Sequence, residues 1–364
     1  MDKLYFLANW GEERQKAWSG TYYGIYTALQ RFFCVKDIEL KAQRNLFDKI
    51  RYNIFKTEDM NLSRISQYRA QVAHFFKQKR GIPIFQFEEV VFNSNAHSTY
   101  IYQDLSASYV KYLSEANPEV FKYSGFSMNS RYAMHKRCKE QMTYYRTCSG
   151  IFTMGNWIRK DLIERCGIAP EKVCHVGGGI NLDWSLINPD SREGNKILFV
   201  GRDFLRKGGF LVYEAFKLLK SDMPDLQLYV AGPSDNPIRQ PIDGYYYWGD
   251  CDHATLSGLF NKCDVFCMPS YFEAYGLVFI EALAYGLPCI GRNAYEMPYF
   301  IEQGETGFLL EKDHVEELAT LIKELLSNER IKKNVIDRRE SYLQKYTWDA
   351  VAERIYHFIV NNAH

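Results

Sequence analysis

The sequence lacks an excess of either charge. It contains 45 Lys and Arg residues against 44 Asp and Glu residues, which gives a formal net charge of +1 over 364 residues. Proteins that bind nucleic acid through its phosphates usually carry a clear excess of basic residues. We therefore expect no nucleic-acid partner.

The sequence also lacks a run of eighteen apolar residues, the length that a helix needs to cross a bilayer. The apolar stretch in MDKLYFLANWGEERQ is too short for a secretory signal and is followed by acidic residues. The nine cysteines form no Cys-x-x-Cys pair, and many lie in apolar runs, as is typical of buried, reduced thiols. We expect a cytoplasmic protein, with peripheral contact at the inner face of a membrane as an alternative.

What the second half does contain is a regular alternation of short apolar runs with helical stretches. Near-continuous apolar strands separated by helices are typical of a parallel sheet covered on both faces, so this half predicts a Rossmann-like domain. The expected strands are 196–201, 226–232, 245–249, 263–270, 287–291 and 307–310, and the expected helices lie around 210–220, 254–262, 276–286 and 313–327.

The first half shows the same alternation less clearly. The expected strands are 3–9, 37–42, 98–104, 150–155 and 172–177. The segment INPDSREGNK, 187–196, combines Pro, Gly and charge and is typical of a linker. We predict an α/β fold of two doubly wound Rossmann-like domains, 1–190 and 191–346, that face a central cleft at the carboxyl ends of their strands.

The stretch FEAYGLVFIEALAYGLP, residues 272–288, follows an expected strand and begins a helix. A helix N-terminus at the carboxyl end of a strand presents free N–H groups and a positive dipole end, which favour an anion. Gly276 allows that anion to approach the backbone closely. Leu277 and Val278 follow it as the first residues of the helix, and we count both as ligand-binding.

Two glutamates flank this helix start. Glu281 lies five residues after Gly276, about 7 Å along the helix axis, which is roughly the distance from a phosphate to the ribose of a nucleotide diphosphate. A carboxylate there can accept hydrogen bonds from the ribose hydroxyls, and Glu273 lies on the side where a sugar would be attached. A solvated helix face is the alternative for Glu281, but its neighbours are apolar and an unpaired buried acid is costly.

The loop in FVGRDFLRKGG, residues 199–209, carries Arg202 and Lys207 directly after another expected strand. An Arg fork and a Lys point charge both suit a diphosphate leaving group. The alternative is an exposed basic loop without a ligand.

Taken in order, these motifs resemble those of retaining glycosyltransferases of the GT-B fold, glycosyltransferase family four. The resemblance covers residues 150–350 strongly and the first 150 weakly. It is carried by FVGRDFLRKGG, LYVAGP, YYYWGDCDHATLSGLFNKCDVFCMPSYFEAYGLVFIEALAYGLPCIG, GETGFLL and the upstream SGIFTMGNWIRKDLIERCGIAPEKVCHVGGGINLD. It implies a hexosyltransferase with a nucleotide-sugar donor bound mainly by the second domain. It also implies that the terminal helix, 347–364, crosses back to the first domain.

The resemblance implies a role for each acid and cation of the second domain. Glu281 matches the acid that binds the ribose, and Glu273 matches the acid that contacts the donor sugar. Arg202 and Lys207 match the pair that binds the diphosphate. No metal or other cofactor is expected.

The first domain is expected to contribute a loop over the donor. Gly20 and Thr21 precede a helix in WSGTYYGIYTALQRFF, residues 18–33. They resemble the family's glycine-rich loop, which closes over the donor phosphates, although Ser19 stands at one glycine position. Plain N-capping is the alternative for this segment.

A second segment of the first domain, STYIYQDLS, is expected to face the acceptor. Many relatives have His-Asp-Leu where this chain has Gln103-Asp104-Leu105. Glutamine cannot exchange a proton but can hydrogen-bond a sugar hydroxyl. We therefore expect Gln103 to bind the acceptor and Asp104 to orient it, with a loop cap as the alternative for Asp104.

The predicted reaction is sugar transfer with retention to a saccharide or lipid-linked acceptor. No acid matches the place of a covalent nucleophile, so we expect same-face attack, with cations and helix N-termini stabilising the departing diphosphate. The alternatives are a GT-B nucleotide-sugar epimerase, a phosphorylase, or a non-catalytic nucleotide-sugar-binding subunit.

Two further features could indicate a metal site and a membrane contact, but each also has an ordinary explanation. Asp250-Cys-Asp252 has the Asp-x-Asp pattern that holds a metal in another glycosyltransferase fold, but a single match is common. The basic segment 31–80 includes RISQYRAQVAHFFKQKR, which could lie on an anionic membrane with its apolar face inward or could be an ordinary packing helix.

Overall fold

The computed structural model describes residues 2–42, 60–77, 79–88, 90, 92–126, 131–188, 192 and 194–362. The chain divides into two compact units. The first comprises Met1–Lys122, Phe126–Gly179 and Thr347–His364, and the second comprises Tyr123–Gly125 and Ile180–Tyr346. Residues 180–188 therefore pack with the second unit, whereas the sequence analysis counted them with the first.

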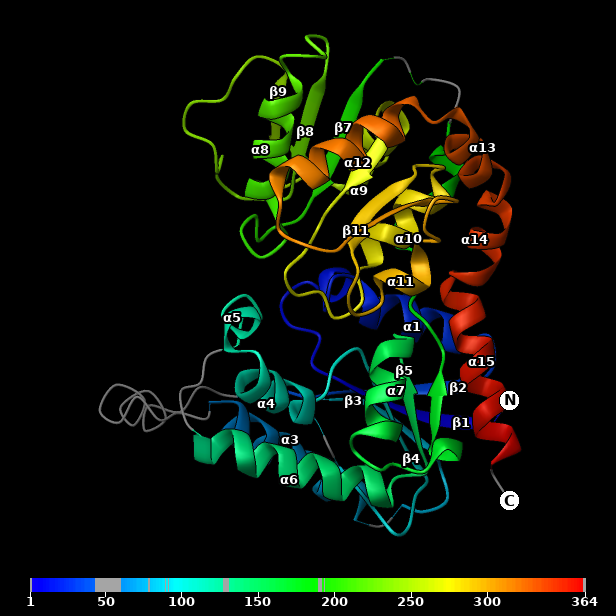
Figure 1. Ribbon diagram of the computed structural model, residues 1–364. Coiled ribbons are helices and arrows are strands. Elements are labelled where there is room, and N and C mark those ends of the chain that lie inside the picture. The colour runs from blue at the N-terminus through cyan, green and yellow to red at the C-terminus, as the bar shows by residue number, and fades with distance from the viewer. Residues whose placement is uncertain are drawn as a thin grey trace. The chain divides into compact units, whose positions relative to one another are not determined.

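The first unit is built on a parallel sheet that has six strands in the described part of the chain, in the order β2-β1-β3-β4-β5-β6 (Figure 1). The strands are β1 (Lys3–Ala8), β2 (Cys34–Glu39), β3 (Ile84–Phe87), β4 (Thr99–Gln103), β5 (Gly150–Thr153) and β6 (Val173–His175). The helices are α1 (Thr21–Leu29), α3 (Met60–Phe76), α4 (Ala107–Ala116), α5 (Pro118–Phe121), α6 (Arg131–Thr147), α7 (Asn156–Glu164) and α15 (Trp348–Asn361). The sequence analysis did not predict β3, which is short and follows Gly81 and Pro83, residues typical of loops.

Side chains of β1 alternate between two helical layers, as the twofold periodicity of a strand requires. Tyr5 and Leu7 pack in one cluster with Tyr68 of α3. Phe6 points to the opposite face, where its ring meets Tyr26 of α1 edge to face at 5.3 Å. The sheet is thus covered on both faces, which explains its nearly continuous apolar strands.

The C-terminal helix α15 belongs to the first unit and lies beside α1 (Figure 1). Phe358 packs edge to face on Phe152 of β5, with ring centroids 5.2 Å apart. The indole of Trp348 lies so close to Gly24 of α1 and to Gly179 that a Cβ atom at either glycine would overlap it. The expected crossing of the terminal helix to the first unit is confirmed.

The second unit has the same architecture. Within the described residues its parallel sheet has six strands in the order β12-β11-β10-β7-β8-β9. The strands are β7 (Lys196–Val200), β8 (Gln227–Ala231), β9 (Tyr245–Gly249), β10 (Val265–Cys267), β11 (Cys289–Arg292) and β12 (Gly307–Leu310). The helices are α8 (Gly209–Leu219), α9 (His253–Lys262), α10 (Leu277–Ala284), α11 (Met297–Phe300), α12 (Val315–Ser327), α13 (Glu329–Asp337) and α14 (Arg339–Lys345). Each strand expected in this half is present, so the predicted α/β, Rossmann-like class is confirmed.

Each sheet reverses its strand order once, between β1 and β3 in the first unit and between β7 and β10 in the second. At such a point, the connections that leave neighbouring strands run to opposite faces of the sheet and leave a crevice at the carboxyl ends. The loops after β7 and β10 are those in which the sequence analysis found its cations and acids. The fold therefore brings these two motifs to one crevice.

The apolar face of α3 is buried inside the first unit. Tyr68 and Val72 have no exposed surface and pack in the cluster under β1 and β3. This part of the basic segment 31–80 is therefore a packing helix whose apolar face contacts protein. Residues 43–59 of the same segment lie outside the described residues.

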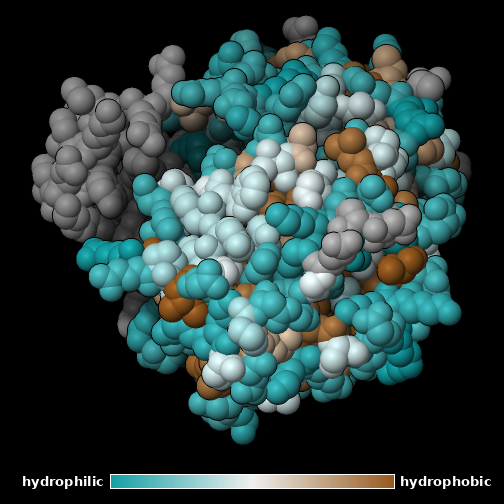
Figure 2. All heavy atoms as spheres, turned by 90° about the horizontal axis from the view of Figure 1, so that it is seen from above, coloured by the Kyte–Doolittle hydropathy of each residue, from teal (hydrophilic) through white to brown (hydrophobic). Residues whose placement is uncertain are grey.

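Over the part of the chain that the structure describes, no helix is both long and apolar enough to span a bilayer. The face drawn in Figure 2 is mostly hydrophilic, with hydrophobic side chains scattered singly or in small groups. Scattered apolar residues of this kind are ordinary on a folded protein.

Two glycine substitutions test the packing of α15. Gly24→Ala places a methyl group against the Trp348 indole, so we expect a loss of about 1–3 kcal/mol in the free energy of unfolding. Gly258→Ala, in α9, meets no atom within 4 Å, so it should gain about 0.5–1 kcal/mol from the better helix propensity of Ala. Urea unfolding followed by circular dichroism measures both. A stabilising Gly24→Ala would show that Trp348 does not pack on α1.

Candidate active site

Two loops of the second unit are joined at the point where the strand order reverses. One follows β7, at 201–208, and the other follows β10, at 268–276. The N–H of Tyr271 donates to the carbonyl of Arg206 at 2.9 Å, and Nη1 of Arg206 donates to the carbonyl of Phe272 at 3.0 Å. The sequence analysis did not single out Arg206, although it lies in the same basic motif as Arg202 and Lys207.

The close approach of these loops depends on Gly208. Its φ is 78°, a left-handed value that suits glycine, and a Cβ atom there would lie 2.5 Å from the carbonyl oxygen of Pro269. A larger residue would have to push the loops apart. The first glycine of the Gly-Gly pair that ends FVGRDFLRKGG therefore has a structural reason in this chain.

Lys207 and Glu273, one from each loop, form an ion pair. Their side chains are only 13% and 11% exposed, so water screens the pair weakly. Removing one partner of such a pair leaves an uncompensated charge, which usually costs several kcal/mol. The two residues that the sequence analysis assigned to the diphosphate and to the donor sugar thus lie in direct contact.

The N-terminus of α10 begins beside this ion pair. Gly276 caps the helix with a φ of 89°, and a Cβ atom at this position would lie 3.3 Å from Cγ of Glu273. Leu277 and Val278 are the first helical residues, half-buried, and N–H groups in the first turn of a helix have no intrahelical acceptor. The structure therefore brings a cation, an acid and a helix N-terminus together at one place.

Glu281 lies further along α10 and is 7% exposed. Its Oε1 accepts a hydrogen bond from the N–H of Asn181 at 3.2 Å. Burial raises the pKa of Glu281 to about 7, and the Asn181 N–H only partly offsets this rise. The sequence analysis expected a buried acid here but missed Asn181, because a backbone donor leaves no trace in residue type.

The neighbouring cation Arg202 is in a different environment. Its side chain is 77% exposed and lies 3.7 Å from a carboxylate oxygen of Asp250. Asp252 caps α9 by accepting the N–H of Thr255 at 2.8 Å. Each acid of the Asp-x-Asp pattern thus has a protein contact of its own, and the described residues hold no cluster of three or more His, Cys, Asp or Glu side chains that could bind a metal.

Arg292 supports the loop after β10 from the end of β11. Its Nε donates to the carbonyl of Ser270 at 2.8 Å and its Nη2 to that of Pro269 at 3.1 Å. Its guanidinium also lies over the ring of Tyr271, 4.8 Å from the centroid. The sequence analysis missed Arg292, because a lone arginine after a strand carries no motif.

The first unit places a strained loop at the carboxyl end of β1. Trp18 and Ser19 have φ values of 45° and 55°, and Gly20 caps α1 with a φ of 85°. Left-handed backbone at non-glycine residues costs of the order of 1–3 kcal/mol each and is common at functional sites. Thr21, the next residue, is buried at the start of α1. The predicted loop therefore lies where the strand order of this sheet reverses.

Gln103 ends β4 in the same unit and is 1% exposed. Its Oε1 accepts a hydrogen bond from the hydroxyl of Tyr145 in α6 at 2.7 Å. Among the described residues, its Nε2 has no partner, and neither has Oγ1 of Thr153, which is its neighbour in the register of β5. Asp104 follows at the same edge and is half-buried. Two buried polar atoms thus lie near the residue expected to orient the acceptor.

Comparison with known proteins gives the same fold and a match to a family for part of the chain. A sucrose-phosphate synthase from Thermosynechococcus elongatus superposes with a TM-score of 0.68 at 17% identity, over 99% of both chains. WaaG, a glycosyltransferase involved in lipopolysaccharide biosynthesis, superposes with a TM-score of 0.67 at 17% identity, over 98% of this chain and 99% of that one. The two parallel sheets with their flanking helices define the GT-B fold.

Residues 186–341 match the family Glycosyl transferases group 1. The chain is 26% identical over 223 residues to a phosphatidyl-myo-inositol mannosyltransferase of Mycolicibacterium smegmatis. The match covers 58% of this chain and 57% of that protein, so the chain spans little more than half the length of this curated relative. The resemblance found in the sequence is confirmed.

The pKa of Glu281 predicts a pH dependence of stability. Between its ordinary value of 4.5 and about 7, the folded protein holds a proton that the unfolded chain has released. The free energy of unfolding therefore falls as pH rises through this range, by up to about 3 kcal/mol. Glu281→Gln carries no charge and should lack this fall, so it should exceed the wild type in stability at pH 8 but not at pH 4.

Urea unfolding of both proteins across this pH range measures the difference. Glu329→Gln is a suitable control, because the Glu329 side chain is 83% exposed. This substitution should leave the pH dependence of the free energy of unfolding as it is in the wild type. A difference between Glu281→Gln and wild type that stays constant with pH would contradict a raised pKa.

Proposed function

We propose that this protein is a retaining glycosyltransferase that moves a hexose from a nucleotide-diphosphate sugar to a saccharide or lipid-linked acceptor. The observation that carries the proposal is the ion pair of Lys207 and Glu273 at the N-terminus of α10. It combines a cation, an acid and free N–H groups, which suit a diphosphate that bears a polyhydroxylated sugar. The family match over residues 186–341 supports the same function.

In the proposed complex, the diphosphate lies at the N-terminus of α10, between Gly276 and Lys207. Lysine has three N–H donors, so Lys207 can keep its bond to Glu273 and still donate to a phosphate oxygen. Glu281, about 7 Å along the helix, accepts hydrogen bonds from the ribose hydroxyls. Arg202, which is exposed, adds its fork to the phosphates.

In the proposed reaction, the acceptor hydroxyl attacks the anomeric carbon from the face that the diphosphate leaves. The bond from the anomeric carbon to the phosphate oxygen breaks, the bond to the acceptor oxygen forms, and the hydroxyl proton passes to the departing diphosphate. Negative charge grows on the diphosphate in the transition state, so Lys207 and Arg202 stabilise it more strongly there than in the ground state. Glu273 orients the sugar.

The acceptor side is assigned to the first unit, to Gln103 and Asp104, with the loop of Gly20 and Thr21 closing over the donor phosphates. A saccharide or lipid-linked acceptor fits the similar proteins, one a phosphatidyl-myo-inositol mannosyltransferase and another involved in lipopolysaccharide biosynthesis. The nine cysteines are free thiols and several are buried, which supports a reducing compartment such as the cytoplasm.

The experiment that tests the function measures turnover of Lys207→Ala at saturating donor. In a transferase we expect kcat to fall about a hundredfold, because one preorganised cation is lost from the transition state. Removing Lys207 also leaves Glu273 unpaired, so Arg202→Ala, at an exposed position, serves as a second variant whose fold is not at risk. Lys217→Ala, on the surface of α8, is the control and should behave as wild type.

The outcomes separate the alternatives. If both variants raise only KM, the two cations are uniform binding contacts and their catalytic role is wrong. If the wild type binds the donor but releases no nucleoside diphosphate with a broad set of acceptors, the protein is a binding subunit. If it releases nucleoside diphosphate and free epimerised sugar, it is an epimerase.

A chelator tests the supply of positive charge at the diphosphate. Because Lys207 and Arg202 provide this charge in the proposed mechanism, activity should survive EDTA at the wild-type rate. The measurement is initial rate with and without EDTA, followed by addition of manganese or magnesium. Complete loss that the metal restores would assign Asp250 and Asp252 to a metal site instead.

A further inference from the structure

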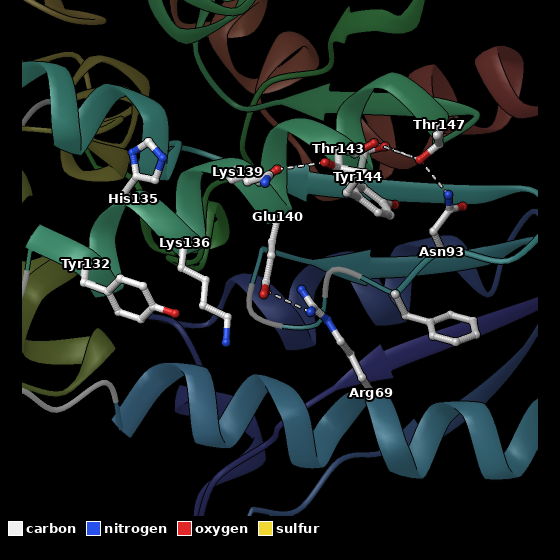
Figure 3. Close-up of a pocket in the computed structure, with 11 residues that line it drawn as sticks. Arg69, Asn93, Tyr132, His135, Lys136, Lys139, Glu140, Thr143, Tyr144 and Thr147 are labelled. Carbon is white, nitrogen blue, oxygen red and sulfur yellow. Dashed lines mark hydrogen bonds and ion pairs between the residues drawn. The ribbon is translucent and has the colours of Figure 1, made fainter.

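A groove of about 680 Å³ lies on the first unit between α3 and α6, over the segment 92–93 (Figure 3). Neighbouring helices in a folded unit normally close such a seam with apolar side chains. In α6, the residues that face the groove include Tyr132, Lys136, Lys139 and Thr143, which recur at helical spacing. One whole side of α6 is therefore polar where it faces a neighbouring helix, and the seam is open.

The charge in this groove is predominantly positive. Figure 3 shows Arg69 extending from α3 and Glu140 from α6, and the two form an ion pair at 2.9 Å. Glu140 thus neutralises Arg69, and it is the one acid among the described residues that line the groove. Lys136 and Lys139 are exposed and form no ion pair with any described residue. Two cations are therefore left for an anionic ligand.

The rest of the groove suits a sugar. Tyr132, at one end, is 75% exposed and offers an aromatic face. At the other end, Nδ2 of Asn93 donates to Oγ1 of Thr147 at 2.6 Å, which places an amide and a hydroxyl side by side. Oγ1 of Thr147 already donates to the carbonyl of Thr143 and Oδ1 of Asn93 already accepts the N–H of Ser94. The second N–H of Asn93 Nδ2 and a lone pair of Thr147 Oγ1 remain to bind the hydroxyls of a sugar. From Tyr132 to Thr147, α6 extends about 22 Å, which exceeds the length of a single sugar.

The Tyr132 end of the groove lies on the side of the sheet where the acceptor is proposed to bind. Sγ of Cys138 donates to the carbonyl of Ala107 at 3.1 Å, and Gln141 accepts the N–H of the same residue at 2.8 Å. Ala107 begins α4, four residues after β4 ends at Gln103, so the part of α6 before Cys138 extends beyond the carboxyl end of that strand, where Gln103 and Asp104 lie.

We propose that this groove binds an anionic oligosaccharide, the part of the acceptor that lies away from the attacked hydroxyl. The inference rests on the proposed function and adds the substrate class: an extended glycan that carries carboxylate or phosphate groups. Lys136 and Lys139 pair with these groups, Tyr132 stacks on a sugar ring, and Asn93 and Thr147 bind hydroxyls. An anionic membrane fits less well, because a helix that lies on a membrane presents a convex apolar face, whereas this surface is a concave groove between two helices.

Calorimetry with three tetrasaccharides tests the proposal: tetragalacturonate, which carries carboxylates, a heparin tetrasaccharide, which carries sulfates, and maltotetraose, which is neutral. We expect an anionic probe to bind at least about tenfold more tightly than maltotetraose, and Lys136→Ala/Lys139→Ala to lose about tenfold of that affinity. Glu140→Gln removes the acid of the groove and frees Arg69, so it should bind the anionic probe more tightly than wild type. Equal binding of neutral and anionic probes, or no binding of any, would overturn the proposal.

Matched controls keep these outcomes distinct. Lys217→Ala/Lys323→Ala removes the same charge from the surface of the second unit and should leave tetrasaccharide binding unchanged. Binding of a nucleoside diphosphate is measured in the same samples, and the groove variants should keep it. If diphosphate binds and no tetrasaccharide does, the groove proposal fails while the proposed function stands. If diphosphate does not bind, the proposed function fails. If vesicles with anionic lipid bind through Lys136 and Lys139 but no tetrasaccharide does, the groove is a membrane contact and the proposal is wrong.

Discussion

The ion pair between Lys207 and Glu273 fixes how the loops after β7 and β10 are arranged, and the candidate site of the second unit depends on this arrangement. It joins the two loops that diverge from the sheet where the strand order reverses. Gly208 lets the two loops approach, and Arg292 holds the loop after β10 by its carbonyls. A weakly screened pair is costly to break, so these loops have one strongly preferred arrangement, which is what a site for a charged donor needs.

Several other features at the carboxyl ends of the strands cost stability. Glu281 is buried with one backbone donor, and its pKa is raised to about 7. Trp18 and Ser19 adopt left-handed backbone conformations, and Gln103 keeps a buried amide nitrogen without a partner among the described residues. A chain selected for stability alone would lose such features, and their concentration at these edges is typical of functional sites. The remaining core is apolar and well packed, and it supplies the stability that these sites reduce.

Helix α6 combines a side that packs in the core with a side that is polar and basic. On one side Tyr144 and Tyr145 pack in the core under β4, β5 and β6, together with Cys148, which follows the helix. On another side the helix is polar and basic and borders the groove with α3 (Figure 3). The apolar residues fix the helix on the sheet, and this leaves the polar residues free to differ without cost to the fold.

The sequence by itself determined the class of the fold and the strands of the second unit, and it singled out the candidate residues of the donor site. These are local properties, because apolar periodicity and the position of a glycine before a helix depend on neighbouring residues alone. Only the tertiary structure decided that Lys207 meets Glu273, that Asn181 donates to Glu281 and that Arg292 supports the loop after β10. Each of these contacts joins residues that are distant in the sequence, and residue type signals neither the backbone donor of Asn181 nor the lone Arg292. The groove between α3 and α6 depends on the same fact: its two walls are more than fifty residues apart, and only the packing of both helices on one sheet brings them together.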